Sequence, residues 1–399
     1  MNKKTLSCIL GLASGSGFAT SLRFIGPIGM SEILFFVALL VLFKKHGKSI
    51  FYPSGYVEFF IKNYIIISML ISLLIVGFIT INFTSVGHNS NLIYVPSFIM
   101  AVFLGFLFAE AIRRGGVDLR ILTNVFLVTF FVMNIFAYIF DINVYESEVR
   151  FSSLSNNPNQ LLFYIATLAL FLGLYARNLF WIAAPFLIYI GIRSGSDAFN
   201  LYLGVVSFSM VMQQVFFSWK MTNGVRFLFL FAMLFFGLLV IWQFYNEYFT
   251  NLWVRADEGG LRILHYKYAL DVTFQSPLFG FGAGSFSGIH GPFEGIEAHN
   301  NFLDLSMQFG FFVPLLIYGI FIAALIKSFY EKQVLLVALI LGFIVSGLFH
   351  YSARHFIFWL EFGVLFAYVF RSTSHYISNS ALNKKMQFSK VIDTDGVSE

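Results

Sequence analysis

The chain has 399 residues, of which 58% are hydrophobic and 11% charged, and its net charge is +5. Soluble domains carry roughly 25% charged residues, so this composition excludes a soluble globular protein as well as a disordered one. The mean hydropathy of +0.79 applies to the whole chain and indicates an all-α, polytopic membrane protein. Its single cysteine, Cys8, allows neither an intramolecular disulfide nor a thiolate metal cluster.

Apolar runs follow one another along most of the chain, and a helix that crosses a bilayer needs about 20 such residues. We expect about 12 transmembrane helices in a single integral membrane domain over residues 1–370, followed by a disordered cytoplasmic tail over residues 371–399. The expected helices cover residues 5–22, 29–43, 64–83, 92–112, 121–140, 158–175, 179–192, 199–217, 225–245, 301–326, 334–349 and 356–370.

The basic residues orient these helices. With the N-terminus inside, 18 of the 25 Lys and Arg residues lie in inner segments and 7 in outer segments, as the positive-inside rule requires. Six of the seven outer residues are arginines, although lysine would orient a helix equally well. Because guanidinium groups bind phosphate through two parallel hydrogen bonds, the outer arginines indicate a phosphate ligand. Alternatively, they reach lipid headgroups or pair with acidic neighbours, and both interpretations fit the sequence.

One outer loop, residues 247–300, is much longer than the other connections, and we expect function to concentrate there. Residues 261–274 predict a helix that lies along the membrane interface, with Arg262 and Tyr266 on one of its faces. A second polar outer segment covers residues 141–157, directly before the sixth expected helix.

Several kinds of site are disfavoured by the residue pattern. The glycines at 280, 282 and 284 resemble a phosphate-binding loop, but they follow no strand and predict only a tight turn. The acidic and histidine residues of the outer loop lack metal-ligand spacing, so we expect neither a metal nor another cofactor. A transporter would carry ionisable groups within its helices. Glu361 lies deep in one of them, where lining a cavity and hydrogen bonding to a neighbouring helix explain it equally well.

The most informative local pattern begins at the end of the long loop with His299, Asn300 and Asn301. Further motifs precede it: Arg150 with Asn157-Pro158-Asn159, Arg193-Ser194-Gly195, and Arg262 ahead of Pro277, Gly280 and Gly282, while Gly310 follows it. In this order and spacing, residues 150–314 resemble the bacterial O-antigen ligase and O-antigen polymerase superfamily. Ile192 and Val313 depart from that family's usual residues.

The resemblance implies a metal-independent membrane glycosyltransferase of the C-type helical class, at the periplasmic face of the bacterial inner membrane. Its donor would be a glycan linked to undecaprenyl diphosphate, clamped by Arg193 and Arg262. His299 would act as the general base, or would hold the acceptor by a hydrogen bond. Further substrate contacts are expected from Arg150, Arg255, Asn157, Asn159 and Asn300. Asn157 and Asn159 fit a helix cap as well as a sugar contact.

Three functions stay open, and we give them in decreasing order of preference. The first is a polymerase that joins oligosaccharide repeat units into O-antigen or a related surface polysaccharide. The second is an O-antigen ligase that moves the finished glycan to lipid A-core, and the third is a polysaccharide transporter or flippase. The expected partners are the lipid-linked donor, a glycan acceptor and membrane lipid, with a chain-length regulator as a further candidate and no nucleic acid.

Overall fold

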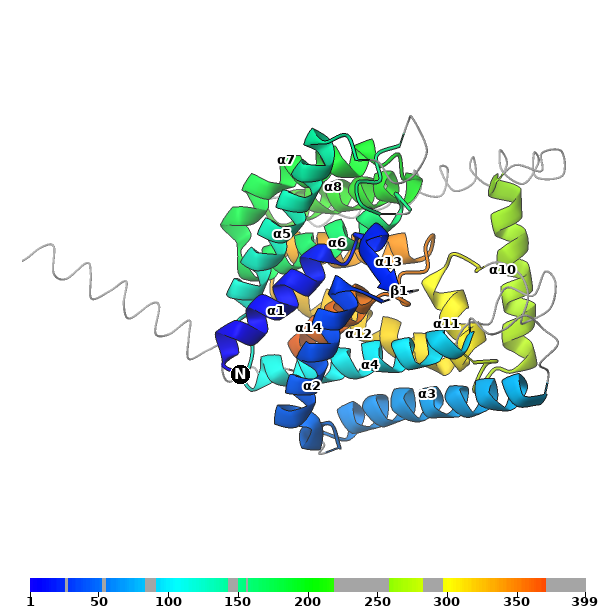
Figure 1. Cartoon of the computed structure of the whole chain (residues 1–399). Helices are drawn as coiled ribbons and strands as arrows, with labels where there is room; N and C mark the ends of the chain where they lie inside the picture. The colour runs from blue at the N-terminus through cyan, green and yellow to red at the C-terminus, as the bar shows by residue number, and fades with distance from the viewer. Residues whose placement is uncertain are drawn as a thin grey trace, which may run out of the picture.

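The computed structural model describes residues 1–25, 28–51, 55–82, 91–142, 150–155, 157–218, 258–282 and 297–370. This part of the chain is helical apart from its connections and one short hairpin (Figure 1). The expected helix at residues 225–245, the tail at 371–399, and residues 247–257 and 283–296 of the long outer loop lie outside the described residues.

A helix forms at each of the first eight expected positions, but three bounds differ clearly from the expectation. The first helix ends at Ser16 rather than at residue 22, and the second and third extend into polar flanking residues. A 3-10 turn (Thr20–Leu22) and an antiparallel hairpin of β1 (Arg23–Ile25) and β2 (Ile28–Gly29) separate the first two. The helices are α1 (Lys3–Ser16), α2 (Met30–Phe51), α3 (Tyr56–Asn82), α4 (Asn91–Arg113), α5 (Leu119–Ile139), α6 (Gln160–Tyr175), α7 (Arg177–Arg193) and α8 (Asp197–Ser218).

The C-terminal half adds α10 (Glu258–Gln275), which contains the helix expected in the outer loop, and then α11 (Asn301–Phe309), α12 (Phe312–Tyr330), α13 (Val334–Gly347) and α14 (Phe356–Val369). Among the described helices, three are long and apolar enough to cross a membrane, namely the part of α4 from Pro96 to Arg113, α5 and α12. Shorter apolar helices are α6, α13 and α14. The count of twelve spans therefore stays a prediction.

The expected helix at residues 301–326 is wrong, because the structure divides it into α11 and α12. Gly310 ends α11 with a φ of +82°, in the left-handed region that favours glycine. A Cβ atom at Gly310 would collide with the backbone of Leu278. The N–H of Phe311 donates to the carbonyl of Pro277 at 2.8 Å. The turn that follows α10 thus occupies the break, and the apolar pattern of residues 301–326 gave no sign of it.

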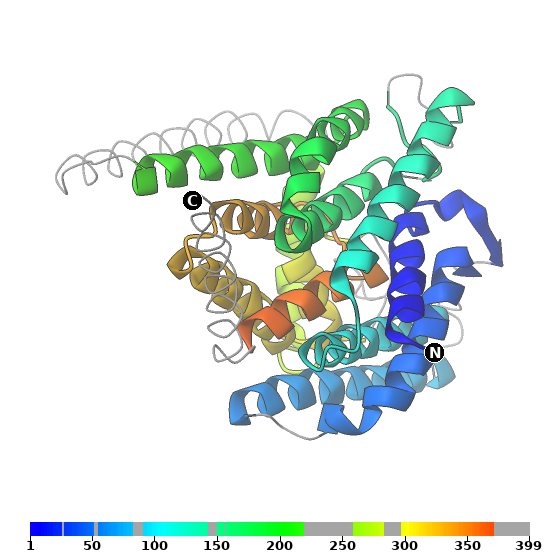
Figure 2. The same ribbon diagram turned by 90° about the vertical axis from the view of Figure 1, so that its left-hand side faces the viewer.

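The core is built around α14, which packs against α4, α6 and α12 and crosses the middle of the view in Figure 2 (orange-red). Its side chains include Trp359 and Phe358, both fully buried. Gly105 and Gly363 bring the backbones of α4 and α14 into direct contact, because a Cβ atom on either would meet the other helix. α10 stands apart at the edge of the bundle, away from α1 (Figure 1).

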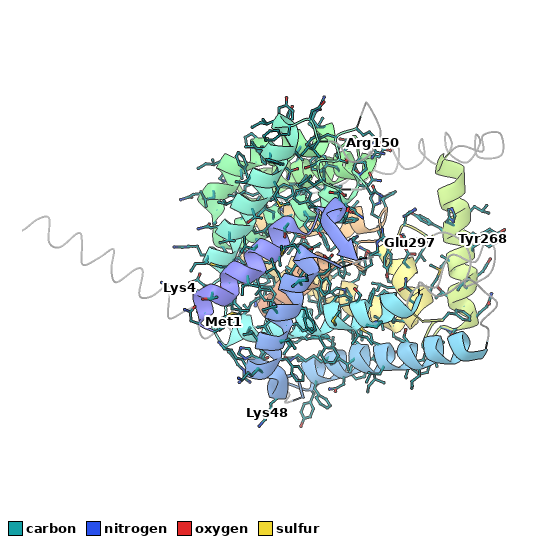
Figure 3. All side chains as sticks on the ribbon, viewed as in Figure 1. Met1, Lys4, Lys48, Arg150, Tyr268 and Glu297 are labelled. Carbon is teal, nitrogen blue, oxygen red and sulfur yellow. The ribbon has the colours of Figure 1, made fainter. Side chains whose placement is uncertain are left out.

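Two residues that are expected inside, Met1 and Lys48, lie on a different side of the bundle from two that are expected outside, Arg150 and Glu297 (Figure 3). At one end, Lys45 Nζ donates to the carbonyl of Met1 at 2.9 Å. Figure 3 places Met1 and Lys48 at this end and Arg150 and Glu297 on the other side of the bundle. These residues agree with the expected orientation, which itself stays a prediction.

Candidate functional site

Three segments from different parts of the chain meet at one pocket of about 130 Å³. They are the start of α6, the residues directly before α11, and the connection between α13 and α14. Three of the predicted site residues, His299, Asn157 and Asn159, face the same pocket. Its full lining is Asn157, Asn159, Gln160, Phe163, Glu297, His299, His350, Tyr351 and Arg354.

His299 lies on a turn whose conformation is unusual. Its φ is +53°, in the left-handed region that non-glycine residues rarely adopt. Such strain persists only when surrounding contacts hold it, and it concentrates at functional sites. Asp304, fully buried in the first turn of α11, supplies those contacts. Its carboxylate oxygens accept from the N–H groups of Ala298 and Asn300, each at 2.9 Å.

Asn300 is the N-cap of α11. Its Oδ1 accepts from the N–H groups of Phe302 and Leu303 at 2.9 and 3.1 Å, which satisfies donors that a helix start leaves open. Its Nδ2 donates to the carbonyl of Leu348 at 2.9 Å. These bonds give Asn300 a structural role that requires no substrate contact, because its side-chain amide connects the His299 turn to the start of α11.

Asn301 fastens the connection between α13 and α14 to the start of α11. Its Oδ1 accepts from the N–H groups of Ser352 and Ala353 at 2.6 and 3.0 Å, and its Nδ2 donates to Ser352 Oγ at 2.8 Å. The close approach needs Gly347, where a Cβ atom would lie 2.8 Å from Asn301 Nδ2. This clamp brings Arg354 to the pocket from a segment some 50 residues away.

The charges at the pocket are arranged around Glu297. Its carboxylate forms a short ion pair with Arg354 and lies 3.9 Å from His299 Nδ1. Burial raises the pKa of Glu297, and Arg354 opposes that rise. The His299 side chain is 42% exposed, so its ring is accessible from the pocket. A histidine with a carboxylate beside one ring nitrogen can accept a proton at the other, which is the arrangement of an oriented base.

Arg150 joins this pocket to the turn after α7. Its Nη2 donates to Asn159 Oδ1 at 2.8 Å and its Nε to the carbonyl of Ser194 at 3.0 Å. Asn157 Oδ1 accepts from the N–H of Asn159 at 2.9 Å. Asn159 occupies the N-cap position of α6 but makes no side-chain cap bond. The cap interpretation of Asn159 is therefore wrong. Its side-chain oxygen instead accepts the hydrogen bond from Arg150.

Of the predicted clamp residues, only Arg193 has a described side chain, and it lies elsewhere. Arg193 lines a second pocket, between α5 and α7, and is not among the residues around the His299 pocket. Arg262 belongs to α10, but its side chain lies outside the described residues, as does all of Arg255. Tyr266, one turn further along α10, donates through its hydroxyl to the carbonyl of Leu348 at 2.8 Å. This contact brings α10 to the residues that hold the His299 turn.

Sequence reasoning missed six residues that line the pocket: Gln160, Phe163, Glu297, His350, Tyr351 and Arg354. A signal was present, because the short connection at residues 350–355, expected on the outer side, contains two histidines and an arginine between two apolar helices. Asp304 was harder to predict. A carboxylate within an expected transmembrane helix gives no indication that it accepts hydrogen bonds from the backbone of a preceding turn.

Two other predictions concern residues outside the pocket. Glu361 is fully buried in α14 and its Oε2 accepts from Thr167 Oγ1 of α6 at 2.8 Å. The hydrogen bond to a neighbouring helix is thus confirmed. The glycine turn is confirmed at Gly280, whose φ is +67°. Within the described ranges, no group of three or more His, Cys, Asp or Glu residues is placed to hold a metal ion.

Comparison with known proteins finds no family model and no curated protein that matches this chain. The resemblance of residues 150–314 to the O-antigen superfamily therefore rests on the motifs alone.

Proposed function

We propose that the protein transfers a glycan from undecaprenyl diphosphate to a sugar hydroxyl at the periplasmic face of the bacterial inner membrane. The observation that carries this proposal is the braced, left-handed turn that presents His299 to a pocket beside Glu297 and Arg354. Asp304 fixes that turn from inside the protein. A cap alone would require none of this, because Asn300 already caps α11.

The reaction would be a displacement at the anomeric carbon of the donor. The acceptor hydroxyl oxygen forms the new bond, the bond to the diphosphate oxygen breaks, and its electron pair leaves with the lipid diphosphate. His299 takes the hydroxyl proton, assisted by the Glu297 carboxylate beside Nδ1. In the competing mechanism His299 only holds the acceptor by a hydrogen bond. Direct displacement inverts the anomeric centre in either case.

Arginines would stabilise the negative charge that develops on the leaving group. Arg193 and Arg262 stay the proposed diphosphate clamp, and Arg255 a further candidate. The hydrogen bond from Arg150 to Asn159 connects Arg150 to the His299 pocket. We therefore place Arg150 where the diphosphate of the donor meets its first sugar. No metal step is proposed, since cationic side chains can supply the charge that a divalent ion would otherwise provide.

The amide groups at the mouth of α6 fit the glycan. Asn157 and Asn159 line the pocket together with Phe163 and Tyr351. Amides that donate and accept, next to aromatic rings, suit sugar hydroxyls and the apolar faces of sugar rings. We assign them to the sugars that flank the reacting bond.

The membrane arrangement we propose has about twelve spans, with both termini in the cytoplasm and residues 247–300 in the periplasm. It is supported by the distribution of basic residues. The separation of Met1 and Lys48 from Arg150 and Glu297 agrees with it (Figure 3). The tail from residue 371 is proposed to be cytoplasmic and disordered.

Within this chemistry we favour a polymerase of O-antigen or related repeat units, with a chain-length regulator as its candidate partner. The high Phe and Tyr content resembles polysaccharide polymerases. A ligase would use the same donor and leaving group and differ only in its acceptor, lipid A-core. A transporter ranks third, because it leaves the His299 turn without a purpose.

Deletion in a host with an intact ligase separates these functions. Loss of a polymerase should leave lipid A-core that carries a single repeat unit, and this is the result we expect. Loss of a ligase should leave bare core while long glycan accumulates on undecaprenyl diphosphate. Unpolymerised units confined to the inner leaflet would indicate a flippase and refute both transferase assignments. Gel analysis of lipopolysaccharide, with extraction of carrier-linked glycan, distinguishes all three.

A further inference from the structure

The carboxyl group of Glu361, which the proposed reaction does not use, is fully buried on α14. Its Oε2 accepts from Thr167 Oγ1 of α6 at 2.8 Å, but its Oε1 has no hydrogen-bond partner among the described residues. The hydroxyl of Tyr202, buried on α8, likewise has none there. Tyr202 lies close enough to Glu361 for the two groups to interact electrostatically. Two buried polar atoms from different helices therefore lie in one region without partners.

This buried polar region lies about one helical turn beyond the His299 pocket. Thr167 follows Phe163, which lines that pocket, by one turn of α6. α14 begins shortly after Arg354, another lining residue. A Cβ atom at Gly342 of α13 would lie 2.9 Å from the Tyr202 ring, so this glycine lets α13 close over the tyrosine. Helices α6, α8, α13 and α14 thus meet around the two polar atoms.

The charged residues of the surrounding helices do not neutralise Glu361. α6 and α13 contain no Asp, Glu, Lys, Arg or His residue, and the charged residue of α8, Asp197, is itself acidic. α14 also packs against α4 and α12. Their charged residues are engaged elsewhere: Glu110 with Arg114, Arg113 with Glu58, and Lys327 with the carbonyl of Tyr368. An ionised Glu361 would therefore be a buried charge with only a hydroxyl group as its donor.

Glu58 shows how a buried carboxylate is accommodated in this protein. It is 2% exposed, and its Oε1 pairs with Lys62 Nζ at 2.5 Å and with Arg113 Nη1 at 2.6 Å. Away from water, an ionised carboxylate without such partners is strongly disfavoured. Glu361 lacks them, so the favourable form at its position is the neutral acid. A neutral acid has an O–H donor, which requires an acceptor when it is buried.

We propose that Glu361 is protonated in the folded protein and that one buried water molecule joins its Oε1 to the Tyr202 hydroxyl. Buried waters typically bridge polar groups that have no other partner. A hard metal cation takes about six or more oxygen ligands, whereas this site offers one carboxyl group and two hydroxyls. The site connects α6, α8 and α14 next to the His299 pocket without a buried charge. It does not depend on glycan transfer.

Infrared spectroscopy of the full-length protein in detergent tests the proton. A protonated carboxyl group has a C=O stretching band that an ionised carboxylate lacks, and this band shifts in D₂O. At neutral pH we expect part of this band to be lost in Glu361→Gln. Glu331→Gln, at an exposed position directly after α12, is the matched control and should leave the band unchanged. Equal bands in the wild type and in Glu361→Gln would refute the neutral acid.

The thermal unfolding temperature gives a second measure of the proton. Glu361→Gln retains a donor and an acceptor in nearly the same shape, so it should fold and unfold close to the wild type at neutral pH. Because the folded wild type holds a proton that the unfolded chain releases, its unfolding temperature should fall relative to that of Glu361→Gln as the pH is raised. A parallel pH dependence would refute the proton. Stabilisation of the wild type alone by Na⁺, but not by choline, would assign the site to a sodium ion and overturn the proposal.

Radiolytic hydroxyl labelling tests the water, because radicals formed from a bound water modify a buried side chain beside it. Tyr202 should therefore be labelled although it is buried. Phe358, a fully buried aromatic residue of α14, is the matched control and should stay unlabelled. Tyr202→Phe removes one end of the bridge and should shift the C=O band of Glu361. An unlabelled Tyr202 would refute the water, and an unchanged band in Tyr202→Phe would refute its connection to Glu361.

Discussion

Asp304 holds His299 without touching it. The carboxylate accepts hydrogen bonds from the two backbone N–H groups on either side of the histidine, those of Ala298 and Asn300, each at 2.9 Å. A buried carboxylate one turn into a helix thereby fixes the φ of +53° at His299 and the direction of its side chain. The relation makes Asp304 a positioning residue in the proposed site.

Replacing Asp304 tests that role. Asp304→Ala leaves two buried N–H groups without acceptors, and a lost buried hydrogen bond destabilises by about 1–3 kcal/mol. We expect a lower thermal unfolding temperature in detergent and a loss of glycan transfer. Asp304→Asn retains one acceptor and should recover part of both. Asp271→Ala, at an exposed position of α10, is the control and should change neither. Normal transfer in Asp304→Ala would remove Asp304 from the site.

His299 itself should matter for rate rather than for stability, because its side chain is 42% exposed. A general base contributes about 10²–10⁴-fold, so His299→Ala should reduce glycan transfer by that factor while the protein level in the membrane stays normal. The same substitution at His375, in the C-terminal tail, serves as the control. His299→Gln separates the mechanisms. Substantial transfer by this variant would support a histidine that only holds the acceptor.

Glu297 gives a prediction for the pH profile. Burial raises the pKa of the Glu297 carboxyl, and the Arg354 guanidinium opposes that rise. Arg354→Ala removes the opposing charge, so the pKa of Glu297 should rise further and its carboxylate should form only at higher pH. Because the ionised carboxylate is proposed to assist His299, the acidic limb of the rate profile should move to higher pH, with a reduced maximum. An unchanged limb would show that Glu297 does not act on His299.

The membrane orientation is tested by labelling. A cysteine introduced at Gly288 in a Cys8→Ser background should react with a membrane-impermeant thiol reagent in intact spheroplasts, because residues 247–300 are proposed to be periplasmic. A cysteine at Lys48 is the matched control and should react only after lysis. Reversal of the two patterns would place the proposed site in the cytoplasm and refute its use of an outer carrier.

The sequence by itself determined most of the helices. Their apolar runs are continuous, and a helix depends on local hydrogen bonds and on the polarity of its own residues. The turn at Gly280 and the start of the helix after His299-Asn300 were also predicted, although the end of that helix at Phe309 was not. The importance of His299 came from a motif and stays a prediction about function.

Only the tertiary structure decided how the site is assembled. Glu297 and Arg354 are 57 residues apart, and they meet because Asn301 clamps the connection before α14 to the start of α11. The break at Gly310 depends on another segment that fills it. Arg193, expected to clamp the diphosphate of the donor, lines a pocket of its own between α5 and α7. Such contacts form between segments distant in sequence, where packing rather than local pattern determines which side chains meet.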